Sequence, residues 1–156
     1  MKRELKPNND VYQLHLEYVI RTHIHDFWKL LTTTDGLQRW FPELERFGDS
    51  LCFTSGDFQQ SLEISHEEKE KELTLDWFGA NVSFTLRQDG TKVFVTFDET
   101  IPNDFPNMVR DLAGWTNQVY RLKIYAETGF MPDKMAMFNE AQYWVEKEIR
   151  KNTPLV

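Results

Sequence analysis

An amphipathic segment at residues 111–129 constrains the fold of this chain more than any other feature. Its apolar residues recur at steps of three, four, three and four, the period of one face of an α-helix. They are Leu112, Trp115, Val119, Leu122 and Ala126. Gly129 followed by Pro132 predicts the end of the helix, because glycine accepts the left-handed conformation and proline cannot continue the turn. Such a helix extends about 28 Å, so its apolar face requires a long apolar surface to cover it.

Much of the preceding chain alternates apolar and polar residues with the period of a β-strand and provides such a surface. The clearest strands are expected at residues 11–20, 58–66, 72–78, 81–88 and 91–98, with weaker ones at 44–47 and 51–54. Asp89 and Gly90 predict a type I′ hairpin between the last two of the clear strands. The inward residues of the final strand are Val93, Val95 and Phe97.

Three further segments have helical periodicity. Residues 22–34 and 36–40 predict two short helices after the first strand, with Thr22 as the N-cap of the first. In the tail, Pro132 and Asp133 predict the start of another helix. Its apolar stripe is Phe138, Ala141, Val145 and Ile149. The stripe has three interpretations, which are packing on its own domain, a lid over a cavity, and a homodimer contact.

The order of these elements predicts an α+β fold of the helix-grip type. A curved antiparallel sheet of about six to seven strands would wrap around the long helix, with two short helices after the first strand. The 156 residues are the size of one ordinary domain. We therefore expect a single domain over residues 1–156, with its core at 11–129 and a helical C-terminal extension at 130–156.

Composition and charge exclude several classes of function. The net charge of −7, without a basic patch, argues against a nucleic-acid partner. The sequence has no apolar run of about eighteen residues and no apolar signal core near its start, so we expect a cytoplasmic protein without membrane insertion. Cys52 is the only cysteine, which excludes an intrachain disulfide. No pattern indicates a cofactor or a metal site.

Three motifs, in order, resemble one protein family. The first comprises Phe27-Trp28-Lys29-Leu30-Leu31-Thr32, Leu37 and Trp40-Phe41. The second is residues 73–99 with Asp76-Trp77 and the Gly90-Thr91 turn, and the third comprises Gly114-Trp115, Val119, Leu122, Glu127 and Gly129. Together they resemble proteins similar to the C-terminal domain of the activator of the heat-shock protein 90 ATPase, a family of the START-like, or SRPBCC, superfamily. The resemblance implies a START-like domain with a deep cavity between sheet and long helix that takes an apolar ligand.

The first functional hypothesis is therefore a module that binds a small apolar molecule. The predicted lining combines helix residues, strand residues with inward parity, Trp40 near the mouth, and Gln60 as an inward polar group. The full set is Trp40, Phe58, Gln60, Trp77, Phe84, Phe97, Trp115, Val119 and Leu122. The alternative is that these rings interlock as a solid core.

Two other classes of function remain as alternatives. The resemblance implies a partner that regulates the ATPase of a chaperone of the heat-shock protein 90 class. The superfamily also includes enzymes that work inside the same cavity, but the sequence shows no catalytic motif. Alternation directs Asp76 and Asp98 outward, and we predict no pair of inward-facing carboxylates and no catalytic residue. An inward acid with a strongly shifted pKa beside a pocket would favour an enzyme.

Overall fold

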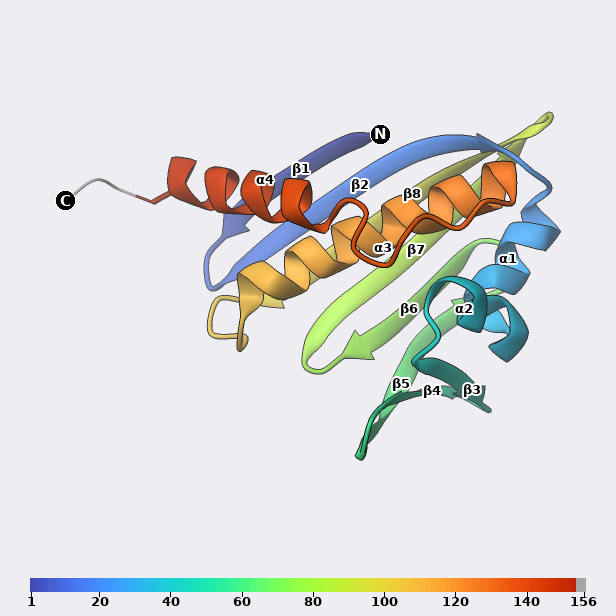
Figure 1. Cartoon of the computed structure of the whole chain (residues 1–156), viewed down its shortest axis with the longest axis horizontal. Helices are drawn as coiled ribbons and strands as arrows, with labels where there is room; N and C mark the ends of the chain where they lie inside the picture. Colours follow the sequence, from blue (N-terminus) through green and yellow to red (C-terminus); the bar gives the residue numbers. More distant parts are fainter. Residues whose placement is uncertain (154–156) are drawn as a thin grey trace.

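The computed structural model describes residues 1–153 and shows an eight-stranded antiparallel sheet with four helices (Figure 1). The strands follow the order β1-β2-β8-β7-β6-β5-β4-β3. Their bounds are β1 Lys2–Asn8, β2 Val11–Arg21, β3 Leu44–Phe47, β4 Ser50–Ser55, β5 Phe58–Glu68, β6 Glu72–Trp77, β7 Ala80–Asp89 and β8 Lys92–Pro102. The helices are α1 Ile24–Thr32, α2 Thr34–Trp40, α3 Met108–Thr128 and α4 Phe138–Lys151. The expected domain ended at residue 156, and its last three residues lie outside the described part.

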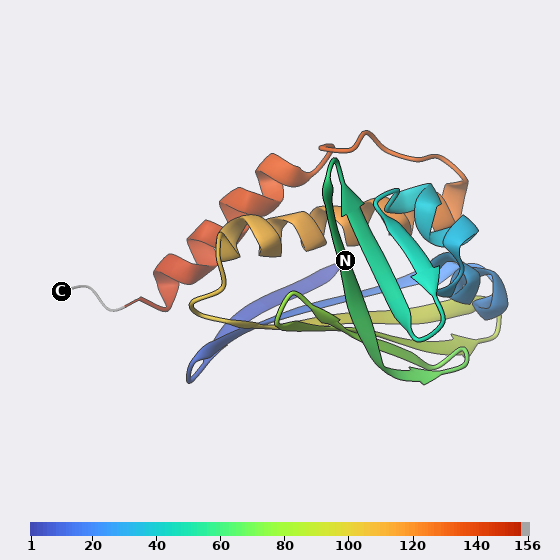
Figure 2. The ribbon, with the colours of Figure 1, turned by 90° about the horizontal axis from the view of Figure 1, so that it is seen from below.

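The long helix α3 lies along the inner face of the curved sheet, as the helix-grip prediction required (Figure 2). Its apolar stripe is buried, with Leu112, Val119 and Leu122 each 0% exposed. The sheet residues beneath it alternate with outward polar ones, and Phe84 on β7 pairs with Phe97 on β8. The core therefore forms where the apolar face of the helix and the apolar faces of the strands are buried against each other.

Strand β1 was not predicted, which is why the expected six to seven strands are eight in the structure. Its sequence is polar, and Leu5 is its one buried residue. It is held by backbone pairing with β2 and by contacts of Arg3, whose guanidinium binds Glu140 of α4 and lies 4.7 Å from the ring centre of Trp144. These contacts are remote in sequence, so no local pattern indicated the strand.

Several predicted boundaries were wrong by a few residues. The N-cap of α1 is His23, whose side chain accepts from the His25 amide, and not Thr22. The tail helix begins at Phe138, after turns at residues 134–137, and not near Pro132. In the β7–β8 hairpin only Gly90 has a positive φ (61°), and Asp89 pairs with Lys92. Because a type I′ turn needs two positive φ values and a type II′ turn one, the predicted type I′ turn is wrong.

The C-terminal segment is fastened to α3 by two buried polar side chains. The Asn117 amide group donates to the Lys134 carbonyl at 2.8 Å and accepts from the Met137 amide at 2.9 Å. The Arg121 guanidinium donates to the carbonyl groups of Pro132 and Trp40, each at 3.2 Å. The segment returns along α3, so that α4 packs beside α3 and β1 (Figure 1). In residues 1–153 we find no helix that is long and apolar enough to cross a membrane.

Strands β3, β4 and β5 form a wing that rises beside α3 (Figure 2). The pairing of β5 with β6 shifts register between Ile64 and His66, as at a β-bulge. A bulge bends a strand and increases its twist, which turns the outer half of β5 out of the plane of the main sheet. The wing thereby stands over the first turns of α3 and contributes one side of the pocket described next.

Candidate functional site

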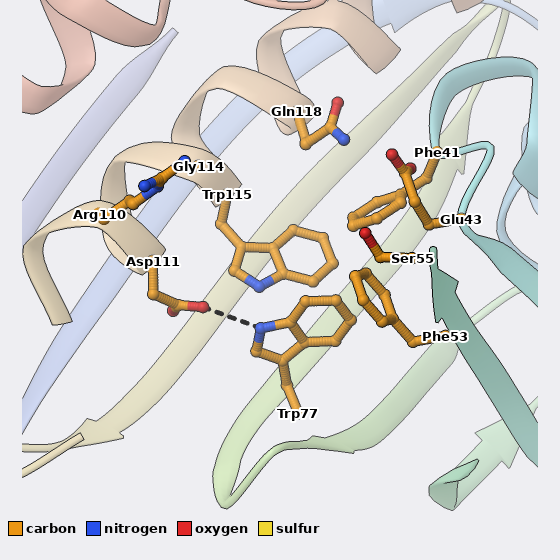
Figure 3. A pocket seen from close by; sticks show the side chains of 10 residues that line it. All are labelled: Phe41, Glu43, Phe53, Ser55, Trp77, Arg110, Asp111, Gly114, Trp115 and Gln118. Atoms are coloured by element: carbon orange, nitrogen blue, oxygen red, sulfur yellow. Dashed lines mark hydrogen bonds between the residues drawn. The ribbon is translucent and has the colours of Figure 1, made fainter. Parts of the chain in front are cut away.

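A pocket of about 320 Å³ lies between the first turns of α3, the end of β6 and the wing (Figure 3). This volume is near the lower end of the range of about 300–1,000 Å³ that is usual for small-molecule sites. Four aromatic side chains line it, namely Phe41, Phe53, Trp77 and Trp115. The other lining residues are Glu43, Ser55, Arg110, Asp111, Gly114 and Gln118.

The aromatic rings form one continuous wall. The ring centres of Trp77 and Trp115 are 4.9 Å apart, and Phe41 lies 5.7 Å from Trp77 and 5.6 Å from Trp115. Phe53 extends the wall into the wing at 5.8 Å from Trp77. Edge-to-face pairs at these distances are mutually favourable, so the wall is preformed without a bound molecule.

Gly114 faces the pocket from the second turn of α3. A Cβ added at this position would meet no atom within 4 Å. Glycine in a helix interior costs about 0.5–1 kcal/mol relative to alanine, and no close contact requires it here. Gly36 in α2 differs, because a Cβ there would lie 2.0 Å from the Lys29 carbonyl oxygen of α1. Gly36 is needed for packing, whereas Gly114 leaves space.

Two carboxyl groups meet beside the inner end of the pocket, and one of them, Asp111, lines it. Asp111, in the first turn of α3, accepts a hydrogen bond at 2.9 Å from the indole N–H of Trp77 (Figure 3). Behind it, Glu99 of β8 is 0% exposed. Neither oxygen of Glu99, nor Oδ2 of Asp111, has a hydrogen-bond partner within residues 1–153, and the same is true of the buried indole N–H of Trp115.

This environment changes the acidity of Glu99. Burial raises the pKa of Glu99 well above its usual 4.5, and the interaction with the Asp111 carboxylate raises it further. Both effects act against the ionised form, because a buried charge loses its hydration and a second negative charge repels it. Glu99 therefore holds a proton under conditions in which an exposed glutamate is ionised.

The rim of the pocket is polar and more exposed. One oxygen of Glu43 accepts from Lys134 at 3.2 Å, while Arg110 is exposed. Phe58, at the tip of the wing, is 52% exposed, and its ring centre lies 6.3 Å from that of Phe53. The site thus combines an aromatic wall, a buried acidic end and a charged rim.

The structure separates the nine predicted lining residues into four groups, of which the exposed one is described in the next paragraph. Trp77 and Trp115 line the pocket, whereas Phe97, Val119 and Leu122 are buried in the core beneath α3. Trp40 and Phe84 border a void of about 10 Å³ at the filled end of the interior. Trp40 is therefore not near the mouth as predicted, since it is 1% exposed and its indole N–H donates to the Leu30 carbonyl at 2.8 Å.

Phe58 and Gln60 were predicted to point into the cavity and are instead exposed. Gln60 pairs with Phe53, so its parity is as predicted. The outer half of β5 nevertheless extends past the sheet that α3 covers, and inward parity buries a side chain only where a second layer faces it. Leu62 and Ile64, further along the same face, are buried as expected.

The buried acid was the largest omission, and the prediction of no inward-facing carboxylate pair is wrong. The parity that directs Val93, Val95 and Phe97 inward also directs Glu99 inward. Its partner Asp111 lies in the first turn of α3, outside the apolar stripe that the sequence predicted. Alternation alone was enough to find Glu99, but the meeting of the two carboxyl groups depends on how α3 crosses the sheet.

Comparison with solved structures identifies the fold. The conserved protein of unknown function EF2215 from Enterococcus faecalis is 26% identical and has a TM-score of 0.89, with 98% of this chain and 93% of that chain covered. CalU16 from Micromonospora echinospora is 18% identical, with a TM-score of 0.72 over 95% of this chain and 97% of that chain. The Aha1 dimer from Colwellia psychrerythraea is 19% identical, with a TM-score of 0.64 over 75% of this chain and 97% of that chain.

These neighbours share the helix-grip fold that the chain shows. The sequence itself matches no protein-family model and no curated protein. The fold is thus assigned by structure, and the function has to be inferred from the site.

Proposed function

We propose that this protein binds a small, largely apolar molecule in the pocket between α3, β6 and the wing. The observation that carries the proposal is a preformed aromatic wall facing space that Gly114 leaves open. Pockets for small molecules are mostly apolar with a few placed polar groups, and Asp111 supplies such a group here. The hypothesis of a solid core describes the other end of the interior, around Trp40 and Phe84, where only about 10 Å³ is free.

Two substitutions at Gly114 test the proposal. Gly114→Met directs a long apolar side chain into the pocket, while Gly114→Ala keeps most of the space and is the matched control. Both residues are good helix formers, so neither is expected to unfold α3. Native mass spectrometry for a co-purified molecule and a thermal-shift screen with small lipophilic compounds measure binding.

We expect binding by wild type and Gly114→Ala and its loss in Gly114→Met, with the melting temperature of both unliganded variants at or slightly above that of wild type. The proposal is wrong if wild type carries no molecule and is stabilised by no compound. It is equally wrong if Gly114→Met binds as wild type does.

The carboxyl pair favours acid–base catalysis on the bound molecule as a second candidate function. Glu99, which burial keeps protonated, lies behind Asp111 of the pocket lining, so the pair offers one proton donor next to one acceptor. The test compares the masses of molecules that co-purify with wild type and with Glu99→Gln. An enzyme would accumulate an unconverted molecule in the variant, whereas identical masses in both proteins indicate binding alone.

Regulation of a chaperone ATPase and dimerisation through α4 rank behind these two. The likeness to the Aha1 dimer is at 19% identity and concerns the fold. No feature of the described residues singles out a chaperone. A pulldown with a chaperone of the heat-shock protein 90 class, read out by ATP turnover, would detect the first, and the molar mass in solution would detect the second.

A further inference from the structure

Apart from the proton that Glu99 keeps next to Asp111, the two carboxyl groups beside the inner end of the pocket have few hydrogen-bond donors. From the other residues of 1–153 the pair receives one hydrogen bond, which Trp77 donates to Asp111. Buried carboxyl groups normally accept several hydrogen bonds or lie next to a cation. Because Glu99 is 0% exposed and lies against Asp111, water outside the fold does not satisfy it.

No basic side chain compensates this end of the pocket. Arg110 is the one basic residue among those that line it, and it is exposed at the rim, where solvent screens its charge. Lys134, close to the rim, is engaged with Glu43 at 3.2 Å. The amide groups in the first turn of α3 favour the negative charge of Asp111, but they do not reach the free oxygens. The inner end therefore carries negative charge without a matching cation.

The wall next to this charge has the chemistry that attracts organic cations. The faces of aromatic rings carry partial negative charge, and tryptophan attracts a cation more strongly than the other aromatic residues do. Trp77 and Trp115 adjoin Asp111, and Phe41 contacts both indole rings. A neutral alcohol would donate one hydrogen bond without balancing the charge, and a carboxylate ligand would be repelled.

We infer that the molecule bound in the pocket is an organic ammonium ion, with its charged nitrogen against Asp111 and its apolar body on the aromatic wall. This inference rests on the proposed binding function and specifies its ligand class. The available volume of about 320 Å³ limits the body to one or two small rings. The ligand then supplies, next to Asp111, the positive charge that the protein lacks at this end of the pocket.

Matched amine and alcohol probes test the inference on the full-length protein. Tryptamine and indole-3-ethanol form one pair, and 2-phenylethylamine and 2-phenylethanol form the other, with affinities measured by isothermal titration calorimetry at neutral pH. We expect each amine to bind at least about tenfold more tightly than its alcohol, as one cation–π contact and one charged hydrogen bond predict.

Asp111→Asn removes the charge and keeps an oxygen that can accept from Trp77. In this variant the preference for the amine is expected to fall to about twofold or less, while the alcohols bind as in wild type. Glu127→Gln is the matched control, since it removes the same charge about 24 Å further along α3 and is expected to keep the preference.

The outcomes separate the inference from the proposed function. Equal binding of amines and alcohols, or tighter binding of alcohols, overturns the ammonium assignment and leaves an apolar binding site. Preference for amines that persists in Asp111→Asn also overturns the assignment to this residue. Failure of all four probes to bind at millimolar concentration overturns the inference and counts against the proposed function as well.

Discussion

The interior beneath α3 has two ends that are built from the same kinds of residue. They differ in packing and in whether their buried polar groups have hydrogen-bond partners. At the filled end, Trp40 is 1% exposed, its N–H is bonded to the Leu30 carbonyl, and the remaining void is about 10 Å³. At the hollow end, the N–H of Trp115 has no partner within residues 1–153 and the space is about 320 Å³. The end with the larger space is thus also the end at which a buried N–H group has no partner, as expected if a ligand fills that space.

The largest difference between the two ends is expected from truncating one ring at each. Trp40→Ala should lower the free energy of unfolding by about 3–5 kcal/mol, because it leaves a cavity in a packed region. Phe53→Ala, on the pocket wall, should cost about 1 kcal/mol, since the ring is already partly exposed. Urea denaturation measures both values. Equal costs for the two rings would show that the pocket end is as tightly packed as the filled end.

Comparing Glu99→Gln with wild type should show how the buried acid changes the free energy of unfolding as the pH rises. Burial and Asp111 raise the pKa of Glu99 in the folded state above its usual 4.5. Between the unfolded and folded pKa values the folded protein keeps a proton that the unfolded chain has lost. Stability therefore falls with rising pH in this interval, by up to about 1.4 kcal/mol per pH unit.

Glutamine does not titrate, so the variant should match wild type near pH 4 and exceed its stability increasingly towards neutral pH. Urea denaturation across this pH range measures the difference. Glu63→Gln, at an exposed position of β5, is the control and should not reproduce the widening gap. A constant difference at every pH would contradict a raised pKa for Glu99.

Replacing each of the two helical glycines with alanine should change the free energy of unfolding in opposite directions. Gly36→Ala at the filled end should lower stability by about 1–3 kcal/mol, because its Cβ would meet the Lys29 carbonyl. Gly114→Ala should raise stability by about 0.5–1 kcal/mol, through the helix propensity of alanine. Thermal and urea unfolding measure both changes. A loss of stability in Gly114→Ala would mean that the glycine has a packing role and is not there to leave space.

The smallest effect is expected at His15, on the outer face of β2. Burial lowers the pKa of His15, but hydrogen bonds to Glu17 and Asp98, at 2.8 Å and 2.6 Å, outweigh it and raise the pKa above 6.5. The charged form then stabilises the fold below about pH 6.5, and this contribution is lost as the pH rises through the folded pKa.

His15→Gln should cost a few tenths of a kcal/mol near pH 5.5 and nothing near pH 9, because the ion pairs are partly solvated. Stability measured at the two pH values provides the check. The effect of Glu99 on stability begins at lower pH. The His15 variant therefore also distinguishes the two pH-dependent contributions. A cost that is the same at both pH values would assign it to packing.

The sequence was sufficient to predict the fold and part of the site. The stripe on α3 and the alternation of β6, β7 and β8 predicted a helix on a sheet, and both periods are local properties of the chain. The same alternation placed Trp77, and the helical stripe placed Trp115, in the pocket wall. These are the positions at which regular geometry determines where a side chain points.

The remaining wall residues depend on features that have no local signature. Phe53 reaches the pocket because the register shift in β5 turns the wing, and Phe41 because α2 ends next to it. The same bend removes Phe58 and Gln60 from the interior, although their parity is inward. Tertiary geometry overrode periodicity at these positions, and a single sequence does not specify that geometry.

The register shift between Ile64 and His66 has a consequence for how ligand preference can change among proteins of this shape. The deep residues Asp111, Trp77 and Trp115 belong to α3 and the main sheet, while Phe53 and Ser55 belong to the wing. Under the proposed binding function, replacements confined to the wing would alter which molecule fits the pocket and would leave Asp111, Trp77 and Trp115 in place. Under that function, the residues that select the bound molecule lie in a different stretch of the chain from those of α3 and the main sheet. One set can therefore evolve, or be engineered, without changes in the other.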